Sequence, residues 1–347
     1  MDQVTHFVLG SAIGTVTIGR RIGARKAALI GGVIAELPDL DFLIPSATEI
    51  DAFTDHRGLT HSVLIHALAS PVLGEALRFV DRRLRDERWL CYGLVFAALS
   101  THALLDGFTT YGTRLLWPIF TEPISWSSIF IIDPLYTLPL LLAFLVSFLA
   151  RTLGRGEPLS GTARRMASLG LILSTAYLGW TLAARQLAET KVLNALAAAG
   201  TRHERLTLTP MPFNSLLWRG LAVDGDRYIN VYVSILDGDA PAALHQHERK
   251  LALEAILPER APVAQIARFS HGFYAMGEAD DAILVRDLRM GLEPVHPFTF
   301  LIARSGSAVT MVTPVQLDSK IDWSQLDWIW QRIFDETAVR DEQAVSL

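Results

Sequence analysis

The sequence predicts an N-terminal all-α polytopic membrane domain with four to six apolar helices, followed by a soluble α+β domain with an antiparallel sheet. The 347 residues are 50% hydrophobic and only 19% charged, with a mean hydropathy of +0.30. Soluble domains carry about 25% charged residues. Long apolar segments occupy residues 1–188, whereas short alternating runs fill residues 189–347. We therefore place the domain boundary between these two regions.

The apolar segments differ in length. Three are long enough to cross a bilayer, namely Trp89–Leu105, Ile129–Ala150 and Met166–Ala184. A fourth, Ser62–Val80, is interrupted by proline and charged residues. The segments Phe7–Gly19 and Ala27–Leu37 are short for upright spans, and we expect them to form a tilted or re-entrant hairpin.

Basic residues cluster between successive pairs of apolar segments. The clusters lie within Arg20–Lys26, Arg82–Arg88 and Arg151–Arg165. By the positive-inside rule, all three face the cytoplasm. This orientation predicts that the intervening connections and residues 189–347 lie on the extracytoplasmic side of a bacterial inner membrane.

The C-terminal region alternates apolar and polar residues over short stretches separated by Asp, Gly and Ser, which predicts strands and turns. The expected strands are Arg205–Met211, Tyr228–Leu236, Ala282–Leu288, Phe298–Arg304 and Ala308–Pro314. Two helices are expected, over Ala242–Leu257 and Trp323–Glu336.

Composition also restricts the chemistry. Cys91 is the one cysteine, so an internal disulfide and a CxxC zinc ribbon are excluded, and a metal would need His and carboxylate ligands. A formal charge of −5 gives no basic footprint for nucleic acid. The expected partners are the lipid bilayer and a lipid or lipid-linked phosphoester, with any protein partner left open.

Side chains capable of metal binding gather at the predicted outer ends of four segments. These read Asp2-x-x-Thr5-His6, Pro38-Asp39-Leu40-Asp41, His56-Arg57-Gly58-Leu59-Thr60-His61-Ser62 and Thr101-His102-x-x-x-Asp106. On a helix, residues four apart are rotated by about 40°, so His102 and Asp106 can reach one ion. Imidazole nitrogen with carboxylate oxygen suits zinc, manganese or iron.

Each of these residues also has an ordinary structural explanation. Asp39 and Asp41 can form a turn after Pro38, and Thr60 can cap a helix. Ionisable groups near membrane depth are costly, however, which favours a shared metal site. Participation of the remaining candidates stays open: Asp2, Glu36, His66 and Asp133.

With Gly31-Gly32, Thr109, Gly112 and Leu116-Trp117-Pro118, the same segments resemble the YdjM-like membrane-bound metal-dependent hydrolases over about residues 1–185. The resemblance implies a relation to zinc-dependent phospholipases C and single-strand nucleases, which cleave phosphoesters. It also implies one or more zinc ions, although manganese and iron fit the same donors. The metal ligands it implies are His6, Asp39, His61, His102 and Asp106, with His56 and Asp41 as further members.

The expected function is a membrane-bound metal-dependent hydrolase of phosphoesters. Asp39 or Asp41 would orient or deprotonate water, and Arg57 would pair with a phosphate; the alternative for Arg57 is an ion pair with Asp51 or Asp55. The alternative function is a non-catalytic, metal-stabilised scaffold or regulatory protein that binds a partner through its C-terminal domain. A transporter is disfavoured, since the ionisable residues lie at one face.

Overall fold

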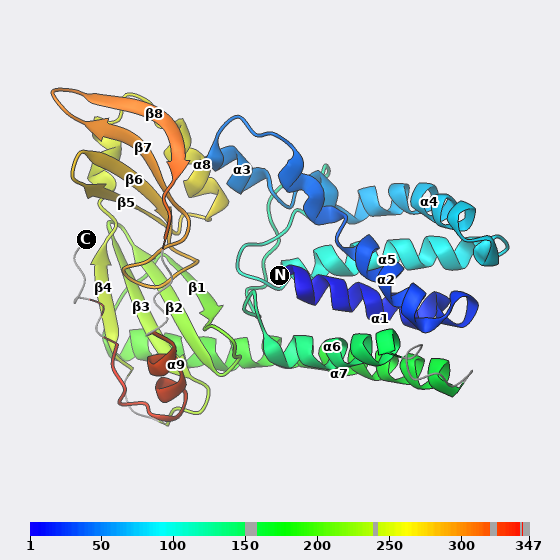
Figure 1. Cartoon of the computed structure of the whole chain (residues 1–347). Helices are drawn as coiled ribbons and strands as arrows, with labels where there is room; N and C mark the ends of the chain where they lie inside the picture. Colours follow the sequence, from blue (N-terminus) through cyan, green and yellow to red (C-terminus); the bar gives the residue numbers. More distant parts are fainter. Residues whose placement is uncertain (150–157, 239–241, 320–324, 341, 343–347) are drawn as a thin grey trace. The chain divides into compact units, whose positions relative to one another are not determined.

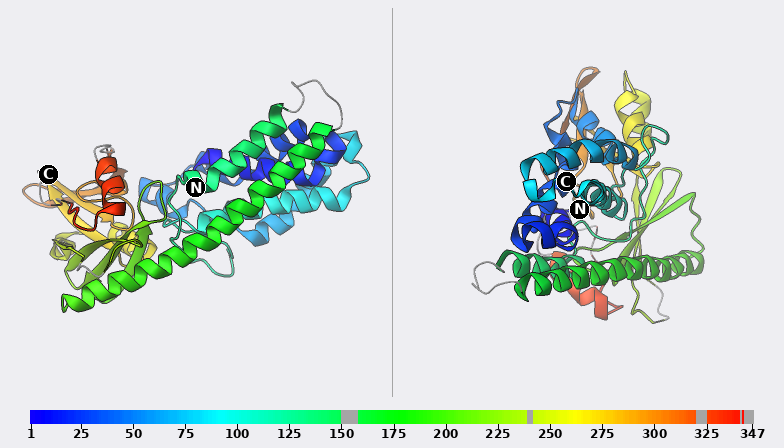
Figure 2. Two further views of the ribbon diagram at one scale, coloured as in Figure 1. Left: turned by 90° about the horizontal axis from the view of Figure 1, so that it is seen from below. Right: turned by 90° about the vertical axis from the view of Figure 1, so that its right-hand side faces the viewer.

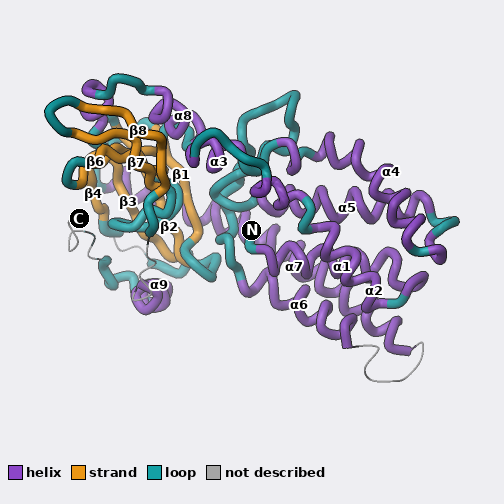
Figure 3. The backbone as a smooth tube through the Cα atoms, turned by 45° about the horizontal axis from the view of Figure 1, so that its top comes forward, coloured by secondary structure: helices purple, strands orange, loops and turns teal. Residues whose placement is uncertain are grey.

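The computed structural model describes residues 1–149, 158–238, 242–319, 325–340 and 342. Contacts divide the chain into two compact units. The first comprises Met1–Ile44 and Arg57–Leu182, and the second comprises Pro45–His56 and Ala183–Leu347. Helices form the first unit, whereas the strands belong to the second (Figure 3). The boundary expected after residue 188 falls inside one long helix, α7 (Pro158–Ala198), which begins in the first unit and ends in the second.

The first unit is a bundle of helices that run side by side (Figure 1). Its longer helices are α1 (Gln3–Ile22), α2 (Ala24–Ala35), α4 (Val63–Val80), α5 (Arg88–Gly107), α6 (Pro134–Leu149) and the first part of α7. Three short 3₁₀ helices connect them: η1 (Pro38–Leu43), η2 (Leu59–His61) and η3 (Arg82–Leu84).

Within the described residues, three helices are long and apolar enough to cross a membrane: Val63–Val80, Arg88–Gly107 and Gly161–Ala198. This is fewer than the four to six that the sequence predicted. The expected span Ile129–Ala150 is reduced to the 16 residues of α6, because Asp133 and Pro134 begin that helix late. At 12 residues, α2 rises only about 18 Å.

The two short N-terminal segments form a tight helical hairpin through glycines. A Cβ atom added at Gly14 would lie 2.2 Å from the Ala27 carbonyl oxygen, and one added at Gly31 would lie 2.2 Å from the Gly10 oxygen. The α1 and α2 backbones therefore touch directly, as small residues allow in membrane helix pairs. Gly23, with φ of +89°, makes the turn between them.

Two of the three predicted basic clusters, Arg20–Lys26 and Arg82–Arg88, meet at one end of the bundle. Arg21 Nε lies 2.7 Å from Glu87 Oε1, and Lys26 Nζ lies 2.8 Å from Asp81 Oδ2. These ion pairs join the α1–α2 turn to the α4–α5 connection. That end is opposite to the N-terminus (Figures 1 and 2). Part of the third cluster, Arg151–Arg155, lies outside the described residues.

The second unit contains two four-stranded antiparallel sheets, which confirms the predicted antiparallel α+β character. The first has the order β1 (Arg205–Pro210), β2 (Leu217–Asp224), β3 (Arg227–Ser234) and β4 (Leu244–Glu248). The second has the order β5 (Tyr274–Ala279), β6 (Ala282–Asp287), β7 (Thr299–Ser305) and β8 (Val309–Gln316).

The two faces of the first sheet differ in chemistry. One face packs apolar side chains such as Trp218 and Val231 against Ala188 and Val192 of α7. Gly220 leaves room for this contact, since a Cβ atom there would lie 2.5 Å from Val192. Strand alternation sends the intervening residues to the other face, which is equally buried and mixes apolar residues such as Leu217 and Leu221 with the polar Arg219 and Asn230.

The helix expected over Ala242–Leu257 was wrong. This segment forms β4 and a short 3₁₀ helix, η4 (Leu251–Ile256), because Leu244–Glu248 completes the hydrogen-bonding edge of β3. Between them, Lys250 adopts the left-handed backbone conformation, with φ of +54°, which ends the extended strand. The other expected helix is present as α9 (Gln325–Phe334), and a helix that the sequence pattern did not reveal, α8 (Ala261–Phe269), precedes β5.

A short helix from the N-terminal part of the chain, α3 (Glu49–Asp55), belongs to the second unit. The ring of Phe53 is buried, with centroids 4.8 Å from Phe269 and 4.4 Å from Phe298. Gln265 of α8 donates a 2.9 Å hydrogen bond to Asp51. The second unit is therefore assembled from two separate stretches of the chain.

The glycine contact between α1 and α2 leads to a stability prediction. Gly31→Val should lower the melting temperature of the detergent-purified protein, because overpacking of a close contact costs about 1–3 kcal/mol. Gly93→Ala is the control, since nothing lies within 4 Å of a Cβ atom there. Equal melting temperatures for the two variants would contradict the direct backbone contact.

Candidate metal centre

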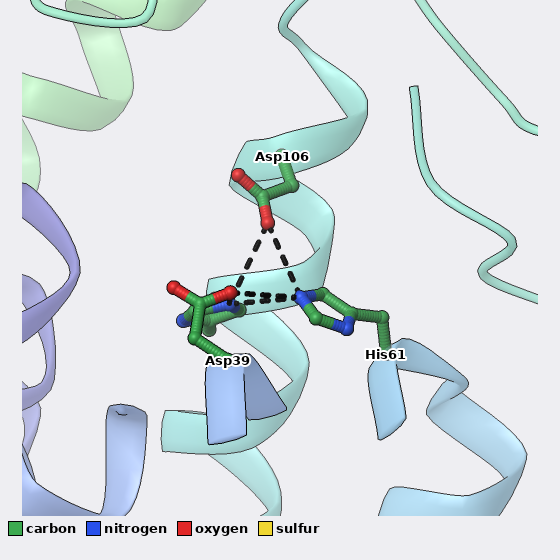
Figure 4. Close-up of side chains that lie close together, drawn as sticks. Asp39, His61 and Asp106 are labelled. Atoms are coloured by element: carbon green, nitrogen blue, oxygen red, sulfur yellow. Dashed lines mark hydrogen bonds and ion pairs between the residues drawn. The ribbon is translucent and has the colours of Figure 1, made fainter. Parts of the chain in front are cut away.

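Four side chains from three segments converge at one point of the first unit. Asp39 lies in η1, His61 ends η2, and His102 and Asp106 lie on α5. Figure 4 shows Asp39, His61 and Asp106 directed toward one another. His61, His102 and Asp106 are fully buried, and the Asp39 side chain is 15% exposed. We call these four residues the metal cluster.

The spacing of the four ligand atoms fits a tetrahedral ion. The atoms are Asp39 Oδ1, His61 Nε2, His102 Nε2 and Asp106 Oδ2. Five of their mutual distances are 3.2, 3.3, 3.4, 3.5 and 3.5 Å. An ion bound at about 2.0–2.1 Å by four tetrahedral ligands separates those ligands by about 3.3 Å. The side chains therefore stand at the separation that such an ion requires.

The two oxygens of Asp106 have different surroundings. Oδ1 forms ion pairs with the Met1 amino group and with Arg57 Nη2 at 3.0 Å, and lies 3.1 Å from His6 Nε2. Oδ2 is buried and receives no hydrogen bond from the described residues. A buried carboxylate oxygen without a donor is costly, and a cation at the cluster would satisfy it.

His61 is oriented by groups outside the cluster. Its Nδ1 lies 3.0 Å from Thr60 Oγ1, and Thr60 in turn donates a 3.0 Å hydrogen bond to Asp41 Oδ2. An Nδ1–H directed at Thr60 leaves the Nε2 lone pair facing the cluster. Asp41 Oδ2 also accepts a 3.1 Å hydrogen bond from the Arg57 backbone. Asp41 thus ties η1 to the segment that carries His61.

His61 and Asp39, the two cluster residues outside the long helices, have pKa values that are shifted by their charged neighbours. Burial alone would lower the pKa of His61, but the facing carboxylates of Asp106 and Asp39 outweigh burial and raise it. Burial alone would raise the pKa of Asp39, but the facing His102 and His61 hold it well below its usual range. Asp39 is therefore a carboxylate at neutral pH.

Arg57 borders the cluster in a strained backbone conformation, with φ of +62°. Its guanidinium pairs with Asp106, donates a 3.1 Å hydrogen bond to Thr109 and lies 5.0 Å from the Tyr111 ring centroid. Its Nε is buried and lacks an acceptor among the described residues. Asp106 is thus an ion-pair partner of Arg57, and Asp51, one of the two partners expected as the alternative, accepts a hydrogen bond from Gln265.

Three residues that the resemblance implied as ligands stand apart from the four ligand atoms: Asp41, which holds Thr60 and the Arg57 backbone, His6 and His56. His6 of α1 stacks on His102 with ring centroids 3.6 Å apart, and its Nε2 contacts Asp106 Oδ1 instead of the shared point. His56 belongs to the second unit. His6 thus buttresses His102 and Asp106, and the described cluster draws only on the first unit.

The residues whose participation was open have other contacts. Asp133 accepts hydrogen bonds from the backbone of Leu135 and from the Tyr177 hydroxyl, so it caps α6. Asp2 caps α1 through Thr5. His66 contacts the Thr60 carbonyl oxygen at 2.7 Å.

The Glu36 side chain differs from these three, because no helix-capping contact is found for it among the described residues. Its Oε1 is buried without a partner among the described residues. Burial, together with the charges of Asp39 and Asp2, raises the pKa of its carboxyl to about 7. Glu36 therefore lies close enough to the cluster to feel its charge.

Sequence reasoning gave Thr60 a capping role and gave Thr109 no role. The structure uses them to orient His61 and Arg57. Both stood within the quoted motif segments, but a hydroxyl that supports a ligand leaves no spacing signal of its own.

Residues 1–188 match a protein family described as YdjM inner membrane protein. The chain is 28% identical over 141 residues to the uncharacterized protein YfhP of Bacillus subtilis (strain 168), covering 39% of this chain and 42% of YfhP. It is 32% identical over 119 residues to the inner membrane protein YbcI of Escherichia coli (strain K12), covering 33% of this chain and 66% of YbcI. The matches thus span less than two thirds of either relative. No solved structure matches significantly.

The cluster geometry predicts the effect of removing ligands. His102→Ala and Asp106→Ala should each lose most of the transition metal that co-purifies with the wild type, measured by elemental analysis. Asp41→Asn should bind metal about 10–100-fold more weakly, because it loosens His61 without removing a ligand.

Asp133→Asn is the matched control, since it changes a buried carboxylate that caps α6 outside the cluster. It should retain the wild-type metal content. Unchanged metal content in both ligand variants would contradict the assignment.

Proposed function

The chain belongs to the YdjM inner membrane protein family, and from its His and Asp cluster we propose that it is a membrane-bound, metal-dependent hydrolase that cleaves phosphoester bonds. The observation that carries the proposal is the convergence of four ligand atoms, which all lie within 4.8 Å of one another and of whose mutual distances five are 3.2–3.5 Å. The proposal includes the relation to zinc-dependent phospholipases C and nucleases that the motifs imply.

Zinc is the metal that the donor set favours. Two imidazole nitrogens and two carboxylate oxygens at tetrahedral separations are ordinary zinc ligands, whereas manganese and iron usually take more ligands. Because four protein ligands complete a tetrahedral site, a bound ion would need a fifth position for a water molecule or a phosphoryl oxygen; there it would acidify the water or polarise the phosphoryl group. The surrounding side chains would accept the proton, position the ligands and bind the phosphate.

Asp39 is the proposed general base. It is ionised at neutral pH, and it is the cluster member that retains solvent access. Its Oδ1 is the atom that faces His61 and His102, so Oδ2 would orient a water molecule and accept its proton. Asp41 acts differently, because its Oδ2 holds Thr60 and the Arg57 backbone. We assign Asp41 the role of a positioning residue for His61.

Arg57 is the proposed phosphate-binding residue. Its guanidinium is held in place by Asp106 and Thr109, so little side-chain entropy is lost when it meets a substrate. Its Nε–H has no acceptor among the described residues, so this donor is available to a phosphate oxygen of the substrate. A planar cation beside the cluster would stabilise the negative charge on a phosphoryl group.

The substrate is proposed to be a lipid or a lipid-linked phosphoester. Exposed apolar side chains directly flank Asp39 in the chain, and they are Leu40, Phe42, Leu43 and Ile44. Consecutive exposed apolar residues of this size mark a surface that contacts a membrane or a ligand. A head group at the cluster would then leave its hydrocarbon part beside these side chains.

An activity assay tests the hydrolase. Zinc-loaded protein in detergent should hydrolyse bis(p-nitrophenyl) phosphate and a phospholipid in mixed micelles, and His102→Ala should abolish both activities. Arg57→Lys should lower kcat/KM by about 100-fold, because it removes the fork of donors but keeps the charge. Its metal content should stay at the wild-type level.

Arg304→Lys is the matched control, since Arg304 pairs with exposed Asp281 in the second unit. Full metal content without hydrolysis of either compound would contradict the hydrolase. It would favour the alternative, a metal-stabilised scaffold or regulator that binds a partner through its C-terminal domain.

The proposed orientation is tested separately. Two of the basic clusters gather at the bundle end opposite to the N-terminus, so we expect that end in the cytoplasm. A C-terminal alkaline phosphatase fusion should then be active, and a C-terminal fluorescent protein fusion should be dark. The reverse pattern would overturn the extracytoplasmic placement of the metal cluster and of the second unit.

A further inference from the structure

An open apolar cavity lies between α1 and α6 in the first unit. These two helices run side by side (Figures 1 and 3), and the cavity has a volume of about 300 Å³. Its apolar walls are Val4, Phe7 and Val8 of α1 and Leu141 and Phe144 of α6. This volume lies at the lower end of the range for ligand sites in proteins. We call this cavity the α1–α6 groove.

Two hydrogen bonds hold the walls of the groove together. The Asp2 backbone amide donates a 3.0 Å hydrogen bond to the Ile131 carbonyl oxygen, three residues before α6 begins. The hydroxyl oxygens of Thr5 and Thr137 lie 2.7 Å apart. Because both contacts join the start of α1 to the start of α6, the two helices leave the same end of the bundle in the same direction. The groove is therefore preformed.

One end of the groove is polar. It is lined there by Gln3, in the first turn of α1, and by Glu36, the residue that follows α2. Glu36 Oε1 is buried and has no partner among the described residues, and an unpaired buried oxygen is costly. Glu36 stands three residues before Asp39, whose charge acts on it. The polar end of the groove therefore adjoins the metal cluster.

The apolar part of the groove continues onto a leucine-rich face of α6. Leu138 and Leu145 lie three residues before and four residues after Leu141, so the three side chains share one face of the helix. Leu138 is 50% exposed and Leu145 is 42% exposed. The sequence of α6 contains no charged residue. An exposed apolar face of such a helix in a membrane protein contacts lipid tails, so the groove opens toward hydrocarbon.

We propose that the α1–α6 groove binds one hydrocarbon chain of a lipid whose phosphate lies at the metal cluster. The order of the surfaces supports this occupant, since the cluster is followed by the polar Gln3 and Glu36 and then by apolar walls. A lipid phosphoester has the same order of phosphate, hydroxyl or ester oxygens, and hydrocarbon. A lipid hydroxyl beside Glu36 donates to its unpaired Oε1. The position of the phosphate rests on the proposed hydrolase, whereas binding of the chain is measured without turnover.

Photolabelling of the full chain tests the groove. The probe is hexadecyl phosphate with a diazirine midway along its chain, and the protein is kept in dodecyl maltoside, a detergent without phosphate. Mass spectrometry of the digested protein should find the probe mainly on the groove residues of α1 and α6. Unlabelled hexadecyl phosphate should compete at least ~10-fold better than hexadecanol, which lacks the phosphate.

Val4→Trp is the test variant, because its indole would fill the groove from an exposed position. Val33→Trp is the matched control, since Val4 and Val33 are both 57% exposed and Val33 does not line the groove. Labelling should fall at least ~10-fold in Val4→Trp, because excluding a few methylenes from the groove suffices for this loss. It should stay at the wild-type level in Val33→Trp.

Three outcomes would overturn the proposal. They are labelling of the wild type spread evenly over its exposed helix faces, equal labelling of the two Trp variants, and equal competition by hexadecanol and hexadecyl phosphate. The first and third need no variant, so a poorly folded Val4→Trp protein would still leave the groove tested.

Turnover separates this inference from the hydrolase. Val4→Trp should lower kcat/KM for hexadecyl p-nitrophenyl phosphate at least ~10-fold more than for bis(p-nitrophenyl) phosphate, which has no hydrocarbon chain. Groove labelling without hydrolysis of either compound would support the groove and contradict the hydrolase. Hydrolysis without groove labelling would support the hydrolase and overturn the groove.

Discussion

The first unit depends on the neutralisation of one buried carboxylate. Asp106 is fully buried on α5, and its Oδ1 collects the Met1 amino group, Arg57 and His6 from separate parts of the chain. A lone charge at this depth would be prohibitively costly, so these partners must assemble around it. Their assembly brings α1, α5 and the Arg57 segment together and turns Oδ2 toward the two histidines. The contacts that pack these helices together therefore also orient Asp106 within the metal cluster.

The sequence could predict what depends on local periodicity. The four-residue spacing of His102 and Asp106 placed both on one helical face, and alternation located five of the eight strands, including β3 and β6. Ala242–Leu257 failed because a short strand of mixed polarity resembles an exposed helix until its neighbour is known. His56 could not be separated from His61 by spacing, since the positive φ of Arg57 redirects the chain between them.

Long-range placement carried no local signal. The ring contacts of Phe53 lie more than 200 residues away in the sequence, and nothing in Glu49–Asp55 marks it as part of the second unit. The same holds for Arg219, whose burial depends on a strand partner and a distant carbonyl oxygen. The second unit buries several charged residues, among them Arg249, Asp287 and Arg289, and no local sequence pattern distinguishes these from exposed ones.

The insertion of α3 into the second unit has a consequence for biosynthesis. Phe53 leaves the ribosome long before α8 and the strand region that contain Phe269 and Phe298. At about 5–20 residues per second, the wait is on the order of tens of seconds. During that interval, a buried aromatic residue of the finished protein is exposed beside the newly inserted helices. The second unit therefore cannot be completed until the chain as far as Phe298 has been made, and Phe53 has no burial partner before then.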